Sequence, residues 1–197
     1  MYIQDIKEKW KRNNKLLLTR ESVCLQELLF LIRMQSHKTL ALWALECVQS
    51  PVAVLKERYP ADTRPQTALC LSAQWAAGHV KMPAAKQAIL QVHGMAKELS
   101  NPADIALCHA VGQACSTVHV ETHAIGLPIY ELTALVHECG IKDCEAALSE
   151  KIAQYVSCLN ICAEQANSLE RQWAAFLLDD TRKNKEQLLC EKTRKAK

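Results

Sequence analysis

Two histidines stand four residues apart near the middle of the chain, at His119 and His123. On one continuous α-helix, side chains four positions apart lie about 40° apart around the axis, so the two imidazoles would share a face. Gly126 and Tyr130 would continue the same stripe. Two imidazoles beside a phenol could bind a metal ion or contact a partner protein.

The zinc-protease pattern is not met by this pair. That pattern places a glutamate directly after the first histidine, whereas Val120 holds this position and Glu121 would project to the other side. A structural metal site would need further ligands, for which His109, Cys115 and Glu131 are the nearest candidates. A metal-binding helical protein centred on the pair, with or without enzymatic activity, is therefore the alternative hypothesis.

A second arrangement of the same residues is equally consistent with the sequence. Thr122 can cap a new helix, which would leave His119 and His123 on either side of a tight junction. The histidines would then brace an interhelical corner or line a surface for a partner.

Other catalytic patterns are absent from the sequence. The chain has no Gly-x-Ser-x-Gly turn and no glycine-rich phosphate loop, and it contains only five glycines. We therefore expect a binding protein without a cofactor rather than an enzyme.

The ten cysteines are predicted to be reduced and mostly buried, as at Cys47, Cys70, Cys108 and Cys115. Cys158 and Cys162 lie one helical turn apart and could bind a metal or each other. No second pair stands at zinc-site spacing, because a predicted helix break separates Cys139 from Cys144. Packing is the favoured interpretation of these thiols.

The elements that must position these residues are predicted to be helices. Alanine and leucine contribute 26 residues each, while runs of β-branched residues are few. The segments are joined by short connections, which favours neighbouring antiparallel helices. The sequence therefore predicts an all-α fold, a compact antiparallel bundle of about seven to nine helices.

Helix boundaries follow from capping residues and prolines. Thr19 and Ser36 are predicted N-caps, and Asn101 followed by Pro102 gives the clearest helix start. That helix should run to about residue 119, and another from about Thr122 to Cys139. A long last helix is predicted from Asp143 through Trp173.

Charge is distributed unevenly along the chain. Residues 1–20 carry six basic and two acidic residues, residues 182–197 carry seven and two, and the part between them carries 11 and 17. An acidic body repels phosphate backbones and attracts basic proteins, so a nucleic-acid partner is not expected. We predict a basic helical extension over 1–20, a domain over 21–180 and a basic tail over 181–197.

No apolar stretch is long enough to cross a bilayer, and no secretory signal follows the basic N-terminus. A cytoplasmic location without a membrane partner is therefore expected.

Three tryptophans and one acid–arginine pair are further candidates for the core or for an interface. Trp43 and Trp75 fall on apolar helical stripes and should lie in the core, whereas Trp173 alternates with charged residues and could anchor an interface. Asp62 and Arg64 stand at a predicted helix start, where the arginine can pair with an acid.

A set of these motifs resembles a known family. They are Leu40–Ala44 with Cys47, Arg58–Pro60 with Arg64 and Pro65, Trp75, Ala76 and Gly78, then Gly112, Thr117–His119, Thr122–Ala124, Gly126 and Tyr130, and finally Glu170, Arg171 and Trp173. Their order and spacing resemble the immunity-protein-five-like family of bacterial polymorphic toxin systems over roughly residues 37–178.

The resemblance implies a protein that binds and neutralises a cognate toxin domain. The partner-binding residues that we expect are Asp62, Arg64, His119, Glu121, His123, Tyr130 and Trp173. It names neither the toxin nor the oligomeric state.

Overall fold

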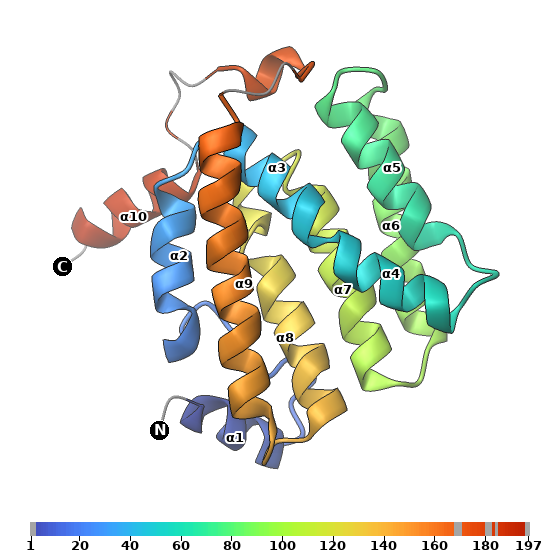
Figure 1. Ribbon diagram of the computed structural model, residues 1–197, viewed down its shortest axis with the longest axis vertical. Coiled ribbons are helices and arrows are strands. Elements are labelled where there is room, and N and C mark those ends of the chain that lie inside the picture. The colour runs from blue at the N-terminus through green and yellow to red at the C-terminus, as the bar shows by residue number, and fades with distance from the viewer. Residues whose placement is uncertain (1–2, 168–170, 180–182, 184, 196–197) are drawn as a thin grey trace.

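The computed structural model describes residues 3–167, 171–179, 183 and 185–195, with no β-strand among them (Figure 1). Its α-helices are α1 (Gln4–Lys11), α2 (Gln26–Arg33), α3 (His37–Cys47), α4 (Gln49–Arg58), α5 (Arg64–Ala76), α6 (Met82–Glu98), α7 (Pro102–Ser116), α8 (Gly126–Cys139), α9 (Cys144–Gln165) and α10 (Lys185–Lys195). Three short 3-10 helices are η1 (Val23–Leu25), η2 (Glu121–His123) and η3 (Ala175–Leu177). The predicted all-α bundle is confirmed.

Helix α7 forms the centre of the molecule. It packs between α6 on one side and α8 on the other. Helix α5 packs on α6, and α9 packs on α8 (Figure 1). The chain of α7 is rich in Ala, Gly and Cys, so its buried surface extends around most of the helix. Small side chains allow neighbouring helices to approach closely, and this central position brings residues from α6, α7 and α8 into contact.

Local sequence explains where several helices begin. The Ser36 hydroxyl accepts a hydrogen bond from the amide of Thr39 at 3.2 Å, and the Asn101 carbonyl oxygen accepts one from the amide of Ala103 at 2.9 Å. Both side chains satisfy an amide that has no partner within its own helix. Both predicted caps are confirmed.

Four predicted boundaries are wrong, and one of them is the start of α8, which lies at Gly126 and not at about Thr122. Thr19 does not start a helix, because η1 and α2 begin after Ser22. Helix α7 ends at Ser116, before the predicted residue 119, and a turn follows it. Helix α9 ends at Gln165, so Trp173 lies in the separate segment that leads to η3.

The N-terminal segment contributes to the main core. Ile3, Ile6, Leu17 and Leu18 are fully buried in the same apolar cluster as the central helices. The amide of Leu17 also donates a 3.3 Å hydrogen bond to the hydroxyl of Thr133 on α8. The division into an extension, a domain and a tail remains a prediction, and parts of 181–197 lie outside the described residues.

The described cysteines are free thiols, and most are buried or half-buried. Cys70 is an exception to the prediction, because it lies exposed on α5. Helix α5 has one buried face and one exposed face, and Cys70 lies on the exposed face. The apolar pattern of the sequence did not show this. Within the described part of the chain, no helix combines the length and the hydropathy needed to cross a membrane.

Candidate functional site

The junction between α7 and α8 contains both His119 and His123. Helix α7 ends at Ser116, the chain turns, η2 covers Glu121–His123, and α8 begins only at Gly126. His119 and His123 therefore do not share one helical face. The structure agrees only in part with the second arrangement that the sequence allows: the two histidines are not on one helix, but Thr122 lies inside η2 and caps no helix.

His119 lies exposed at the outer side of this junction. Its ring centroid is 5.7 Å from that of Trp75, and the ring of Phe176 lies 5.6 Å from Trp75. Phe176 comes from the C-terminal segment, which is fixed by a 2.7 Å hydrogen bond from the amide of Ala174 to the carbonyl of Ala76. We call Trp75, His119 and Phe176 the aromatic end.

Glu121 lies buried beside the same junction. A carboxylate oxygen of Glu121 is 3.8 Å from Nδ1 of His37, whose Nε2 lies 2.8 Å from the carbonyl oxygen of Thr117. The backbone carbonyl of Thr122 accepts a 2.5 Å hydrogen bond from Arg20. These contacts join the start of α3 and the N-terminal segment to the turn, so Glu121 has a positioning role within the protein.

His123 contacts the inner side of the junction. Its Nδ1 lies 2.8 Å from Oε1 of Gln113 on α7. Gln113 fits because Gly126 lacks a side chain: a Cβ at Gly126 would lie 2.4 Å from the same oxygen. The sequence feature that allows this contact is therefore a glycine at the first residue of α8.

Two further histidines lie close to this contact. Nδ1 of His93 on α6 is 2.9 Å from Nδ1 of His109 on α7, and the His109 ring centroid is 5.1 Å from that of Tyr130. Burial lowers the pKa of His93 and of His109, and the neighbouring imidazole of His109 lowers the pKa of His93 further. We call His93, His109, Gln113, His123 and Tyr130 the histidine cluster.

The histidine cluster contains three imidazoles, of which His93 and His109 contact each other and His123 contacts Gln113. In the part of the chain that the structure describes, no group of three or more His, Cys, Asp or Glu side chains could hold a metal ion. The metal-ligand set that the alternative hypothesis needed around His119 and His123 is not brought together among these residues.

A different kind of site lies at the start of α5. The guanidinium of Arg64 donates to both oxygens of Glu98, at 2.8 and 2.6 Å, and also to Asp62. Hydrogen bonding to these carboxylates, first Glu98 and then Asp62, raises the pKa of Arg64, and the arginine lowers the pKa of both acids. The loop between α4 and α5 is therefore tied to the end of α6.

A second arginine, Arg58, is the last residue of α4. Arg58 forms ion pairs with the buried Asp104 and, at 2.6 Å, with Glu138 at the end of α8. The hydroxyl of Tyr59 donates a 2.6 Å hydrogen bond to Asp104, and this bond to the acid raises the pKa of Tyr59 to about 12. We call Arg58, Asp62, Arg64, Glu98 and Glu138 the charged end.

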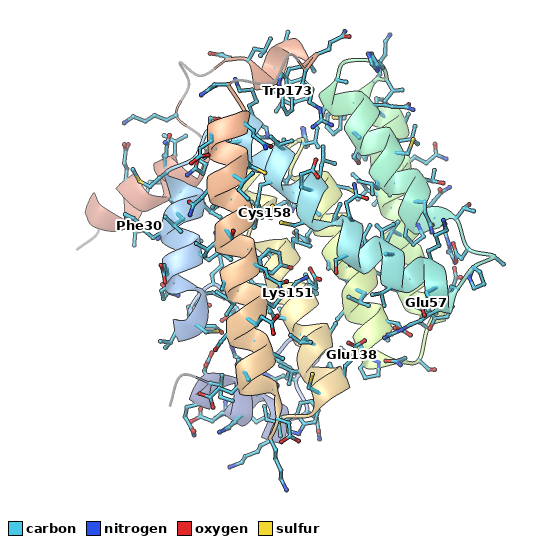
Figure 2. The ribbon with its side chains drawn as sticks, in the orientation of Figure 1. Phe30, Glu57, Glu138, Lys151, Cys158 and Trp173 are labelled. Atoms are coloured by element: carbon cyan, nitrogen blue, oxygen red, sulfur yellow. The ribbon has the colours of Figure 1, made fainter. Side chains whose placement is uncertain are left out.

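The expected partner-binding residues are divided between separate surfaces. Arg64 begins α5 and Trp75 lies near its end, so at about 1.5 Å per residue the charged end and the aromatic end are roughly 16 Å apart along the helix. Figure 2 shows Trp173 at one extremity of the molecule, with Glu57 and Glu138 toward the other. His123 and Tyr130 belong to the histidine cluster.

A comparison with protein-family models matched residues 31–158 to the family described as Imm-5 like putative immunity protein. The chain belongs to this family. The family that the sequence motifs indicated is thereby confirmed. Comparisons with curated proteins and with solved structures found no match.

The sites differ in whether they lie within the residues that match the Imm-5 like family. The charged end and the histidine cluster fall entirely within residues 31–158, whereas α1, Trp173 and Phe176 fall outside it. The aromatic end is therefore completed by a segment beyond the matched part of this immunity-family chain.

Glu131, one of the metal-ligand candidates, has a structural environment in this member of the Imm-5 like family. Its carboxylate accepts a hydrogen bond from the buried Tyr155 hydroxyl and pairs with Lys151 at 2.7 Å. The Tyr155 carbonyl accepts a 3.1 Å hydrogen bond from the indole of Trp43. These contacts hold α3, α8 and α9 together through a polar group that is satisfied inside the core.

Trp173 is half-buried, and the guanidinium carbon of Arg171 lies 5.4 Å from its ring centroid. Its indole nitrogen is buried without a hydrogen-bond acceptor among the described residues. The side chain packs on the main core and on a second apolar cluster that includes Trp75 and Leu177, so a large part of it covers the body of this immunity-family chain.

Three residues of these sites, His93, Gln113 and Glu98, were not predicted from the sequence. His93 and Gln113 are isolated polar residues on apolar helices, and no spacing links them to His109 or His123. A usable signal was present in the glycines, because Gly112 and Gly126 are internal to helices or at their starts, where glycine needs a packing reason.

Proposed function

We propose that this chain binds a cognate bacterial toxin domain and neutralises it by occlusion, acting as a binder rather than as an enzyme. The observation that carries this proposal is the Imm-5 like family match across the helical body. The helical scaffold supports it, because the ionisable side chains of the central motifs are engaged in internal contacts and the polar groups left for a partner lie on the outer surface.

The charged end is the surface that we propose for the toxin. Its two arginines are already held by acids, Arg64 by Glu98 and Arg58 by Glu138. Side chains that are ordered before binding lose less conformational entropy when a partner docks. The charged end also lies on elements inside the family match, unlike the aromatic end.

The charge of this surface favours a basic partner. Glu57, Glu98 and Glu138 are exposed there, and Glu98 leaves 62% of its side chain accessible while it contacts Arg64. Exposed carboxylates speed association with a basic surface and have smaller effects on the final affinity. The toxin face that fits this site is therefore rich in lysine or arginine.

The expected contact residues outside the charged end would contribute conditionally or indirectly to toxin binding. His119 and Trp173 would contribute only if the toxin also reaches the aromatic end. Glu121, His123 and Tyr130 would act indirectly, by holding the α7–α8 junction. Of the seven partner-binding residues expected from the sequence, Asp62 and Arg64 are the ones that we propose as direct contacts.

Growth rescue tests the proposal. Cells that express the toxin encoded beside this chain should grow when the chain is co-expressed, and the two proteins should co-purify. The double variant Glu98→Lys and Glu138→Lys should lose rescue. Its matched control, Glu27→Lys and Glu150→Lys, changes the net charge equally at exposed positions on α2 and α9 and should retain rescue.

Two results would contradict the proposal. Rescue without a detectable complex would exclude occlusion as the mechanism. Equal rescue by both double variants, with the complex intact, would place the toxin on another surface. Circular dichroism melting of each variant shows whether any loss of rescue comes from unfolding.

A further inference from the structure

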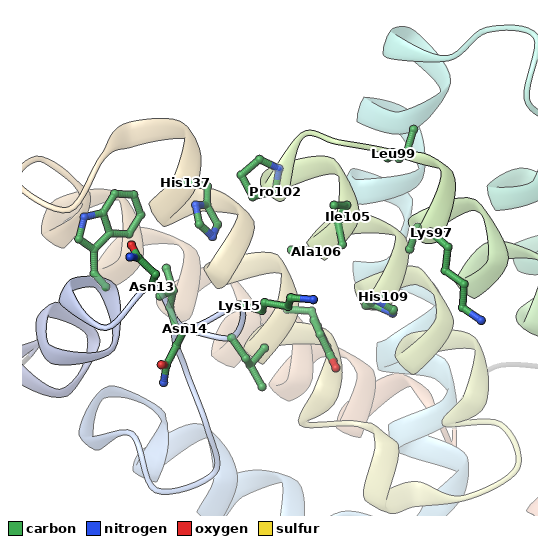
Figure 3. A pocket seen from close by; sticks show the side chains of 15 residues that line it. Asn13, Asn14, Lys15, Lys97, Leu99, Pro102, Ile105, Ala106, His109 and His137 are labelled. Carbon is green, nitrogen blue, oxygen red and sulfur yellow. The ribbon is translucent and has the colours of Figure 1, made fainter.

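A pocket of about 740 Å³ opens beside the histidine cluster (Figure 3). It lies between the segment 13–17, the end of α6, the first turns of α7 and the inner side of α8. Pockets that bind small organic molecules usually have volumes of about 300–1,000 Å³. The volume is therefore suitable for a small molecule rather than for a folded partner.

Most of the wall is apolar. Leu16 from the N-terminal segment faces Ile105 and Ala106 of α7, and Leu99 and Pro102 line the side next to the α6–α7 turn. Such a wall gains free energy by covering the hydrocarbon part of a ligand.

The charged side chains that line the pocket have the same sign. They are Lys15 and Lys97, and no aspartate or glutamate is among the lining residues. In Figure 3, Lys15 extends toward the side where Ala106 and His109 lie, while the amine of Lys97 points outward at the edge. No hydrogen bond or ion pair within the described residues occupies either amine.

The inner end of the pocket offers further polar groups. Nδ1 of His109 contacts His93, so its Nε2 is the ring nitrogen left for a ligand, and the phenol of Tyr130 lies next to this ring. His137, whose ring centroid is 5.3 Å from that of Trp10, lines the opposite side. A negatively charged group would meet an ammonium, a phenol and an imidazole without meeting a carboxylate.

We propose that this pocket binds a small organic anion with an apolar body, such as an aliphatic or aromatic carboxylate or sulfonate. Lys15 binds the anionic group, and the wall formed by Leu16, Ile105 and Ala106 covers the apolar body. The inference is independent of toxin binding, because the residues that line the pocket include none of the five that form the charged end.

Two matched dyes test the proposal on the full-length chain. 8-Anilinonaphthalene-1-sulfonate carries an anionic group, and N-phenyl-1-naphthylamine has the same aromatic body without the sulfonate. Fluorescence titration should show one site that binds the sulfonate more tightly. Lys15→Gln should weaken sulfonate binding about fivefold or more and leave the neutral dye almost unchanged, whereas Lys15→Arg should retain it.

Three controls make the result specific. Lys86→Gln removes an exposed lysine on α6 that does not line the pocket and should change nothing. Ala106→Trp should fill the pocket and abolish binding of both dyes. Phe30→Ser removes an exposed apolar side chain on α2 and should leave the titration intact, which separates the pocket from nonspecific dye binding.

The proposal is overturned if the two dyes bind equally, or if Lys15→Gln has no effect on the sulfonate. It is also overturned if Ala106→Trp, still folded by circular dichroism, binds the sulfonate as before. None of these outcomes bears on growth rescue, so this inference and the proposed function can fail separately.

Discussion

Nδ1 of His93 and Nδ1 of His109 lie 2.9 Å apart, so only one of these two nitrogens can carry a proton in this contact. The other must accept it, because an imidazolium has a donor at each nitrogen. At least one member of the pair is therefore neutral, and the contact joins α6 to α7 next to the pocket. Sequence spacing gave no indication of this bond, yet it determines how the centre of the molecule should respond to pH.

The free energy of unfolding should decrease as the pH falls below the ordinary histidine value of 6.5. Burial lowers the pKa of both His93 and His109 in the folded state, and Lys97 and His123 add positive charge near His93. The unfolded chain then binds protons first, which favours unfolding at acidic pH. Urea denaturation at a series of pH values from neutral to mildly acidic measures this effect.

His109→Gln should flatten that pH dependence, because it removes one of the two depressed groups and the repulsion at the other. His79→Gln is the control: His79 is exposed and contacts Gln172 only at the surface. A pH profile that is the same in wild type and His109→Gln would show that the pair does not titrate as described.

Gly112→Ala should destabilise the fold by about 1–3 kcal/mol, the usual cost of overpacking a core. A Cβ at this position would lie 2.4 Å from Cε1 and Nε2 of His93, so the imidazole must leave its bond to His109. Gly94→Ala is the matched control, since nothing lies within 4 Å of its Cβ, and it should stabilise the helix by about 0.5–1 kcal/mol. Opposite signs in chemical denaturation are expected, and two equal effects would refute the close contact.

Tyr155→Phe should lower the free energy of unfolding by about 1–3 kcal/mol. The substitution removes the hydroxyl that donates to Glu131, a buried carboxylate whose other main partner is Lys151. Gln154→Ala, at the neighbouring exposed position, should change stability by less than about 0.5 kcal/mol. Thermal or urea denaturation compares the two, and a neutral Tyr155→Phe would mean that Glu131 does not depend on this bond.

Alkylation should distinguish two groups of cysteines. Cys70 and Cys139 are exposed and should react first with iodoacetamide. Burial raises the pKa of Cys108 and of Cys115 to about 12, so both thiols should stay protected until the chain unfolds. Peptide mass spectrometry over time gives the order of modification. Early reaction of Cys115 would contradict the close packing of α7.

The sequence predicted some of the helix starts that depend on neighbouring residues. Ser36 and Asn101 begin their helices as expected, because an N-cap acts through an amide only two or three residues away. The end of α7 was predicted too late, and α9 was predicted to continue to Trp173, because composition does not show where tertiary contacts replace helical hydrogen bonds. Ala174 illustrates this, since its amide donates to Ala76 from far along the chain.

The candidate sites were predicted less completely for the same reason. The expected contact between Arg64 and an acid was correct in kind, but Glu98 could be identified only once α6 was placed beside α5. His119 and His123 stand close together in the sequence, yet they contact different residues, Trp75 and Gln113, in the structure. The pocket also requires segments 13–17 and 96–109 to meet, and no local pattern encodes that meeting.

We propose that this Imm-5 like chain neutralises a toxin by covering it with the charged end. A titration of the purified toxin's activity with the purified chain, alongside the variant Glu98→Lys/Glu138→Lys, tests this proposal directly. Activity should fall to zero at one equivalent of wild-type chain, whereas the folded variant should need a large excess. Undiminished toxin activity at saturating wild-type chain, or identical titrations for the two proteins, would contradict it.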